Sequence, residues 1–246
     1  MNRNHLFKLL LGIALALSVN CAWSQDIRTF TARYQLRFYG LSGGILQLTL
    51  RKGDAPNEFI YESRAEPSFL GSFMVSDQAR ESCTMTIDEN GVRPLKFFSD
   101  DGKKGDEKDS NIQFDWERKR LTGRSERVDF NQELPEHIQD HLSIQIAVIR
   151  ALLQNSEPGE YSLMDTGEIK KFTYSKDGTG TVKYKGRTLD ATIIRSARSD
   201  NPGGRIIRYW HAPELGYVPV RAERSRNGKI DLTMDLLDVK FPEAPK

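Results

Sequence analysis

Histidine residues are the first candidates for chemistry in this sequence. His137 and His141 are four residues apart, and Glu136 precedes them. On a helix this spacing would place two imidazoles on one face, as a zinc site requires. However, Pro135 and a predicted helix cap at Asp140 place His137 ahead of the helix, and a third ligand would have to come from His211 or a distant carboxylate. We therefore predict no metal site, and expect exposed or capping histidines.

Cys83 is the candidate nucleophile, because the other cysteine, Cys21, lies in the N-terminal segment considered below. Cys83 belongs to an alternating run from Val75 to Ile87 and shares its parity with Met85 and Ile87. No base stands beside it in the sequence, as nucleophilic catalysis would require. We predict a buried strand residue rather than a reactive thiol, and no intramolecular disulfide in the exported chain.

Other catalytic signatures are missing from the sequence. There is no Gly-x-Ser-x-Gly motif, which marks one large class of hydrolases. The glycine-rich stretch 40–44 leads into a strand pattern rather than a helix, so it does not predict a phosphate-binding loop. The acidic residues of the segment 100–109, together with Asp235 and Asp238, are typical of loops and strand edges. We predict no catalytic residue and no cofactor.

The elements that would position any site are mostly strands. Apolar and polar residues alternate along many short segments, which is the pattern of half-buried strands. Turn sequences such as Asp177-Gly178, Asn201-Pro202-Gly203-Gly204 and Asn227-Gly228 separate them. The predicted strands cover residues 30–38, 46–51, 58–64, 75–87, 93–98, 111–116, 120–128, 170–175, 181–184, 188–196, 205–211, 217–224 and 230–239.

One segment, His141 to Gln154, has the pattern of a helix, with Asp140 as the predicted N-cap and Pro158-Gly159 beyond its end. Its apolar residues cover most of the helix circumference, so we expect it to be surrounded by protein. The predicted fold is mainly β: a strongly curved antiparallel sheet, or half-open barrel, of about a dozen strands wrapped around one buried α-helix. We expect it to form a single domain over residues 25–246.

The N-terminal segment has the layout of a secretory signal peptide. Basic residues precede an apolar run, Leu9 to Val19, and Ala22-Trp23-Ser24 offers a cleavage site after Ser24. Asn20 before Cys21 disfavours lipidation at that cysteine. We predict a periplasmic protein without a transmembrane segment in the mature chain.

The charge balance bears on the class of partner. The segment 1–24 carries two basic residues, Arg3 and Lys8, and no acidic one; without those two, the 36 Lys and Arg residues equal the 34 Asp and Glu residues in number. A mature chain of zero formal charge lacks the basic excess of nucleic-acid-binding proteins, so we predict no nucleic-acid partner.

Three segments carry a resemblance to a known family. They are the strand Phe30-Thr31-Ala32-Arg33-Tyr34 with its Gly40 and Gly43-Gly44 turn, the helix entry Asp140-His141-Leu142-Ser143, and the stretch from Tyr209 to Arg221. Together they resemble the bacterial exported family catalogued as domain of unknown function 3108. That resemblance implies a fold but no catalytic residues. A curved sheet around a helix is also similar to periplasmic lipoprotein carriers and lipocalin-like barrels, a similarity of fold alone.

The leading functional hypothesis is a non-catalytic binding or carrier protein for an apolar, lipid-like ligand at the cell envelope. Strands rich in aromatic and aliphatic residues around an apolar helix form an interior that is either a filled core or a cavity. Two alternatives stay open: an envelope assembly protein that acts through protein–protein contacts, and a hydrolase of unrecognised type. The residues predicted to line the cavity are Tyr34, Phe38, Trp116, Ile146, Ile149, Tyr209 and Trp210.

Overall fold

The structure is a computed structural model and describes residues 27–73, 76–105, 108–165 and 167–242. The predicted signal peptide, with its cleavage site after Ser24, lies outside these residues. The described elements are β1 (Phe30–Phe38), β2 (Leu41–Lys52), β3 (Glu58–Pro67), the 3₁₀ helix η1 (Gly71–Phe73), β4 (Arg80–Asp88), β5 (Gly91–Asp100), β6 (Ser110–Asp115), β7 (Arg120–Ser125), β8 (Val128–Glu133), β9 (Ile138–Gln139), α1 (Ser143–Leu153), β10 (Gly159–Asp165), β11 (Glu168–Tyr184), β12 (Arg187–Arg198), β13 (Asn201–His211), the 3₁₀ helix η2 (Pro213–Leu215), β14 (Pro219–Arg226) and β15 (Lys229–Lys240).

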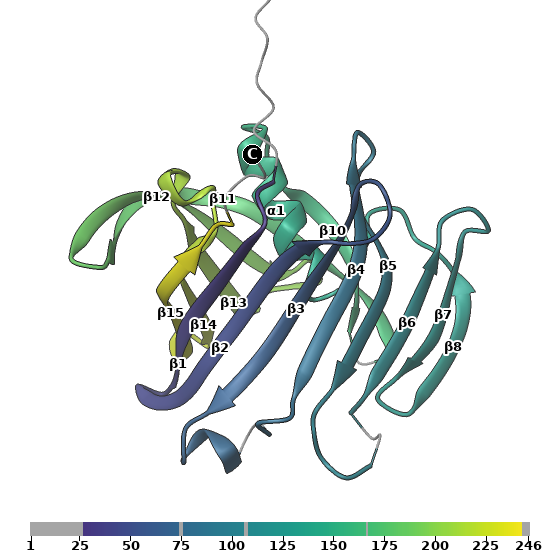
Figure 1. Cartoon of the computed structure of the whole chain (residues 1–246), viewed down its shortest axis with the longest axis horizontal. Helices are drawn as coiled ribbons and strands as arrows, with labels where there is room; N and C mark the ends of the chain where they lie inside the picture. The colour runs from purple at the N-terminus through teal and green to yellow at the C-terminus, as the bar shows by residue number, and fades with distance from the viewer. Residues whose placement is uncertain (1–26, 74–75, 106–107, 166, 243–246) are drawn as a thin grey trace, which may run out of the picture.

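All strands of the described residues belong to one sheet of fifteen strands (Figure 1). From β1 the chain meanders outward to β8 at one edge, and from β9 at the other edge it meanders back to β15, which pairs with β1. Every pair is antiparallel except β9 with β10, which run parallel. The pairing of β15 with β1 therefore joins the two halves of the chain into a continuous sheet.

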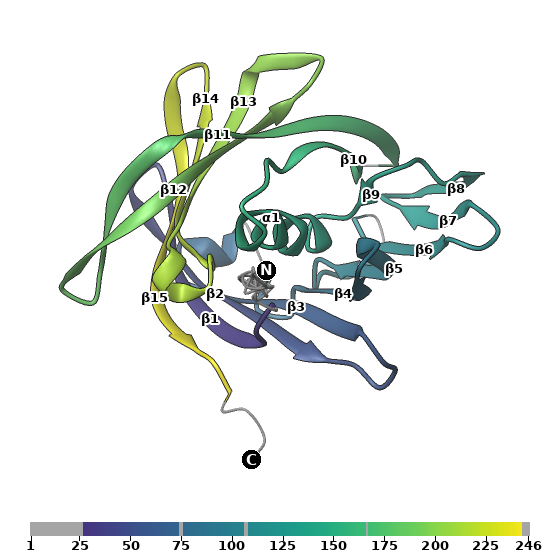
Figure 2. The same ribbon diagram turned by 90° about the horizontal axis from the view of Figure 1, so that it is seen from above.

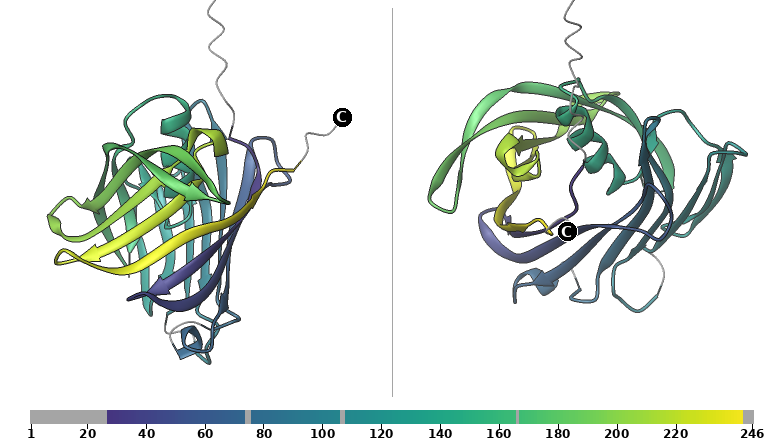
Figure 3. Two further views of the ribbon diagram at one scale, coloured as in Figure 1. Left: turned by 90° about the vertical axis from the view of Figure 1, so that its left-hand side faces the viewer. Right: turned by 45° about the horizontal axis from the view of Figure 1, so that its top comes forward.

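The sheet is strongly curved and its two edge strands are not paired with each other. Seen from above, it curls around α1, while β6, β7 and β8 extend outward at one side (Figure 2). The views from the side and from an oblique angle show the same open curve (Figure 3). The β9 edge returns to β5, where the Gln139 Nε2 donates a hydrogen bond of 2.9 Å to the Val92 carbonyl. At this place, which we call the seam, a side-chain hydrogen bond connects β9 with β5, although the two strands are not paired in the sheet.

The helix α1 lies on the concave side of the sheet and most of its residues are buried (Figure 2). Ile146 and Ile149 belong to the same apolar core as Tyr61, Met85 and other inward-facing strand residues. The entry to α1 is fixed by Asp140, whose Oδ1 accepts hydrogen bonds from the backbone N–H groups of Leu142 and Ser143 at 2.8 and 2.9 Å. Among the described residues no helix is both long enough and apolar enough to cross a membrane.

The predicted class, mainly β with one helix, is confirmed. The predicted number of strands is wrong, because the sheet has fifteen rather than about a dozen. The strand predicted over 120–128 is two strands, β7 and the start of β8, joined by a tight turn at Glu126 and Arg127, both with positive φ. The short β9 and the strand β10 were not predicted.

Two further details of the prediction are corrected. The Asp177-Gly178 turn does not reverse the chain: it forms an irregularity between Lys176 and Thr179 within the long strand β11, where Gly178 has a φ of +113°. The strands predicted over 170–175 and 181–184 are therefore one element. The helix begins at Ser143, two residues after the predicted start. Asp140 nevertheless makes the hydrogen bonds expected of a cap, because its Oδ1 accepts from the N–H groups of Leu142 and Ser143 and its carbonyl accepts from that of Ile144.

Candidate functional site

An apolar cavity of about 90 Å³ lies between α1 and strands β10 to β14. Most of its wall is aliphatic or aromatic, which is typical of sites for apolar ligands. A few polar groups complete the lining. The lining residues are His141, Ile144, Gln145, Val148, Leu163, Phe172, Tyr174, Ser196, Arg205, Ile207, Tyr209, His211 and Pro219.

His211 is the most constrained polar group of this cavity, with 2% of its surface exposed. After η2 the chain turns through Gly216 and Tyr217, both left-handed, with φ near +60°. The Tyr217 carbonyl thereby lies 2.7 Å from Nδ1 of His211. Because a carbonyl only accepts, Nδ1 carries the proton and Nε2 is the acceptor of the neutral ring. That Nε2 has no hydrogen-bond partner among the described residues.

The ionisation of the cavity residues follows from their burial. Desolvation lowers the pKa of His211 to about 4, although its hydrogen bond to Tyr217 opposes the shift. Burial also raises the pKa of Tyr174 to about 12 and that of Tyr209 above its ordinary value, and Arg205 opposes both shifts. At neutral pH the His211 imidazole and the phenols of Tyr174 and Tyr209 are therefore neutral. Arg205, at an exposed position, contributes a cation to the lining.

A second, larger depression, the polar cleft, has a volume of about 530 Å³ and lies on the other flank of α1. It is bounded by β5, the turn after β6, the segment around β9, and the C-terminal part of α1. Charged and amide side chains make up much of its lining, in contrast to the apolar cavity. The lining residues are Asn90, Gly91, Val92, Arg93, Trp116, Glu136, His137, Gln139, Ala147, Arg150, Ala151, Gln154, Ser156, Glu157, Pro158 and Tyr161.

Cys83 and Asp140 form a buried pair beneath the start of α1. The thiol donates a hydrogen bond of 2.9 Å to the Asp140 Oδ2. Burial raises the pKa of the Cys83 thiol, and the nearby Asp140 raises it further. Burial likewise raises the pKa of Asp140, which its hydrogen bonds oppose. A protonated, fully buried thiol is a poor nucleophile, so this pair serves to hold the helix entry against β4.

Glu81 stands two residues before Cys83 on β4, near the same helix entry. Burial raises the pKa of Glu81, and the adjacent His141 opposes that shift. The His141 ring also packs edge-on against Phe97, with 6.3 Å between the ring centroids. His141 therefore lines the apolar cavity and also lies close to Glu81 at the helix entry.

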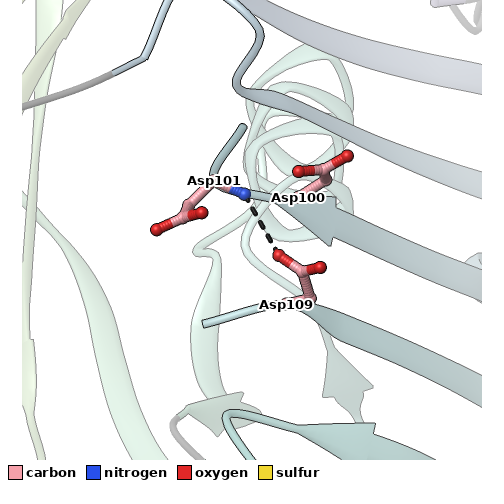
Figure 4. Close-up of side chains that lie close together, drawn as sticks. All are labelled: Asp100, Asp101 and Asp109. Atoms are coloured by element: carbon pink, nitrogen blue, oxygen red, sulfur yellow. Dashed lines mark hydrogen bonds between the residues drawn. The ribbon is translucent and has the colours of Figure 1, made fainter. Parts of the chain in front are cut away.

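Three carboxylates meet at the loop between β5 and β6 (Figure 4). Asp100, Asp101 and Asp109 each place an oxygen within 4.8 Å of the others. These oxygens are largely engaged in the loop itself: Asp109 accepts from the Asp101 N–H, Asp100 accepts from the Gly102 N–H, and Asp100 pairs with Arg80 at 3.3 Å. These contacts stabilise the loop. The group contains none of the histidines, His137, His141 and His211, that the sequence analysis considered as metal ligands.

The structure separates the two histidines of that set. His137 precedes β9 with a φ of +54°, is exposed and lines the polar cleft. His141 precedes α1 and lines the apolar cavity. The two rings therefore do not share a helical face, as the four-residue spacing would have required.

The seven residues predicted to bind a ligand are dispersed. Tyr209 lines the apolar cavity, and Trp116 lines the polar cleft. Trp210, next to Tyr209 on β13, points to the opposite face of the sheet, where the Arg221 guanidinium lies 5.9 Å from its ring centroid. The other four line neither depression.

The side chains of those four residues pack within the fold. Tyr34 is fully buried, and its hydroxyl donates to the Pro219 carbonyl at 2.9 Å. Phe38 is half-buried at the end of β1, beside Gly43. Ile146 and Ile149 pack within the core.

Several cavity and cleft residues were not predicted, notably Gln139, Arg150, Arg205 and Tyr174. The odd-numbered positions of β13 from Arg205 to His211 all line the apolar cavity, so the period of two could have indicated Arg205 and Ile207 together with Tyr209. No sequence signal distinguishes Gln139, because its role depends on the return of β9 to β5.

The fold is similar to that of a solved protein. A β-barrel-like protein of the domain of unknown function DUF1849 from Brucella abortus superposes with a TM-score of 0.53 at 12% identity, covering 89% of this chain and 99% of that one. The hypothetical lipoprotein YmcC from Escherichia coli aligns over 92% of this chain and 89% of its own, with a TM-score of 0.31 and 12% identity. No curated protein sequence matches the chain.

The sequence also matches a family model, "Protein of unknown function (DUF3108)", over residues 33–236. The match runs from β1 to β15 and so includes both depressions and the helix between them. On this coverage, the chain belongs to the DUF3108 family.

Proposed function

We propose that this protein is an exported, non-catalytic binding or carrier protein of the cell envelope, and that its ligand is an apolar, lipid-like molecule, part of which inserts into the apolar cavity. A periplasmic location is part of the proposal and rests on the basic and apolar segments and the small residues that precede position 25. The sheet wrapped around α1 acts as the holder of the ligand rather than as a catalytic scaffold.

The observation that carries the proposal is the composition of the cavity wall. Ile144, Val148 and Leu163 offer aliphatic surface, whereas Arg205 stands at an exposed position. Such a wall favours an amphiphile with its apolar part against α1 and its polar end near the guanidinium. A donor on the ligand, such as a hydroxyl, would also satisfy the acceptor nitrogen of His211.

Mass spectrometry of organic extracts from protein purified out of the periplasm tests the proposal directly. We expect a lipid at near-stoichiometric amount. Ile207→Trp should fill the cavity and reduce the bound lipid, whereas Ile206→Trp, on the opposite face of β13, is the matched control and should retain it. Extracts without a stoichiometric lipid, together with no saturable uptake of fatty acids or phospholipids, would refute the carrier function.

A second candidate, contact with another envelope component, is favoured by an exposed aromatic pair. Phe69 and Phe73 are 81% and 73% exposed, and their ring centroids lie 5.7 Å apart at the connection between β3 and β4. Exposed apolar residues that cluster in this way often mark an interaction site. Photo-crosslinking in cells from position 69 should give one discrete adduct, and the exposed position Lys119 should give none.

A further inference from the structure

We infer that the polar cleft is a second binding site, and that its ligand is a neutral, polyhydroxylated molecule of the saccharide class. The cleft and the apolar cavity flank α1 on different sides and share no lining residue. The inference is therefore independent of the lipid-carrier proposal.

The first argument is the size and position of the cleft. Its volume of about 530 Å³ falls in the range of small-molecule sites. Arg93 and Gln139 come from β5 and β9, Trp116 from the turn after β6, and Arg150 from α1. The site therefore lies where the β9 edge of the sheet returns to β5, and four separate segments position its side chains.

The second argument is hydrogen bonding. Gln139 is 3% exposed, and because its Nε2 donates to the Val92 carbonyl, the orientation of its amide is fixed with Oε1 as an acceptor. That Oε1 has no partner within the described part of the chain. Arg150 donates to the Asp88 carbonyl at 2.6 Å and is thereby held beside the cleft with further N–H groups. A hydroxyl group both donates and accepts, so one ligand hydroxyl suits both kinds of partner.

The third argument is the aromatic part of the wall. The Trp116 indole N–H donates to the Pro94 carbonyl at 2.7 Å, which fixes the ring by its edge. The Arg93 guanidinium carbon lies 5.2 Å from the centre of the same ring. Tyr161 lines the cleft and packs edge-on against Tyr174. Rigid aromatic groups with one apolar surface and one polar end suit the C–H face and the hydroxyl rim of a sugar ring.

The fourth argument is charge. Among the Arg, Lys, Asp and Glu residues of the lining, the cations Arg93 and Arg150 are balanced by the carboxylates Glu136 and Glu157. A cleft with no net formal charge offers little electrostatic attraction to a phosphate or a carboxylate. The balance therefore favours a neutral ligand over an anionic one.

Titration of the full chain with maltotriose, cellotriose and chitotriose tests the inference, with inorganic phosphate at matched ionic strength as the anionic probe. We expect a saturable change of tryptophan emission with at least one trisaccharide and none with phosphate. Trp116→Phe should remove the emission change, and Trp210→Phe should leave it, because Trp210 lies on the outer face of β13.

The variants separate this site from the apolar cavity. Gln139→Leu should weaken trisaccharide binding about tenfold by calorimetry, whereas Gln132→Leu on β8 should not. If Gln139→Leu fails to fold, Arg93→Met provides the same comparison. Ile207→Trp, which fills the apolar cavity, should leave trisaccharide binding unchanged. The inference is overturned if calorimetry detects none of the three trisaccharides, if phosphate binds as well as they do, or if folded Gln139→Leu and Arg93→Met both bind normally.

Discussion

At the scale of single residues, one hydrogen bond decides the state of the His211 ring. The Tyr217 carbonyl holds the proton on Nδ1 and leaves Nε2 as an acceptor in an apolar wall. Charging this ring would require a buried cation next to aliphatic side chains, which explains its lowered pKa of about 4.

This lowered pKa predicts a pH-dependent stability. Between about pH 6.5 and pH 4 the unfolded chain binds a proton at His211 and the folded chain does not, so the free energy of unfolding falls as the pH falls through this window. The loss at this site amounts to at most about 3 kcal/mol. Urea unfolding of wild type and His211→Gln at pH 7, 5.5 and 4.5 should give a flatter pH dependence for the variant. Equal slopes would contradict the assignment.

Cys83 should be unreactive in the folded protein. Its side chain is fully buried, its thiol is bonded to Asp140, and its raised pKa keeps it protonated. An aromatic disulfide reagent at pH 8 should modify Cys83 only as fast as the protein unfolds, and at once in denaturant. Rapid modification of the native protein would show that β4 is accessible beneath the helix entry.

Residue patterns in the sequence predicted some of these environments and not others. The burial of Cys83 follows from its parity with Met85 on an alternating strand, and the structure confirms it. The roles of His211 and Gln139 depend on a carbonyl brought round by a left-handed turn and on contact between distant strands. Neither contact leaves a periodic trace in the sequence.

At the scale of elements, α1 contributes to both depressions and to the core. Ile144 and Val148 line the apolar cavity, and Ala147 and Ala151 line the polar cleft. Ile149, on a further part of the circumference, packs in the core. The apolar residues around α1 thus face three different places: the apolar cavity, the polar cleft and the core.

Ile149→Asp tests the packing of this helix. The substitution places an unpaired charge in the core and removes an aliphatic side chain, so we expect a loss of about 3 kcal/mol or more of unfolding free energy. Gln154→Asp, at the exposed C-terminal end of α1, is the control and should cost less than about 1 kcal/mol. Thermal and urea unfolding measure both. A near-wild-type melting temperature for Ile149→Asp would contradict the buried position of the helix.

The elements predicted best were those with a long, unbroken period. The helix was located to within two residues, and most strands of the first half agree closely with their predicted ranges. The errors arise where turn residues stand inside a strand, as Gly178 does in β11, or where a strand is as short as β9. In both cases tertiary pairing overrides the local signal.

At the scale of the whole molecule, the strands of the sheet differ in whether they lie around α1. Strands β1 to β5 and β10 to β15 surround α1, whereas β6, β7 and β8 extend past the seam at β9 (Figure 2). Most side chains of β8 are exposed. The sequence predicted a curved sheet, but not which strands would lie outside the curve, because β6, with Ile112 and Phe114, alternates as regularly as the inner strands do.

This asymmetry predicts uneven protection of the backbone amides. Strands with little buried apolar surface open locally at a lower free energy than the core. Hydrogen exchange followed by mass spectrometry should show faster exchange in β8 than in β1 or β12, although all three are strands of one sheet. Equal protection of β8 and β1 would contradict this prediction.

The pairing of β1 with β15 sets a condition on the folding of the chain. Thr31 is opposite Lys240, so the first strand completes its hydrogen bonding only when the last strand is present. Such a contact closes a loop of almost the whole described chain, and contacts of this separation slow the folding of β proteins. The described sheet therefore becomes continuous only once β15 has reached β1, and any fragment that lacks β15 would leave this edge of β1 open for pairing with another strand.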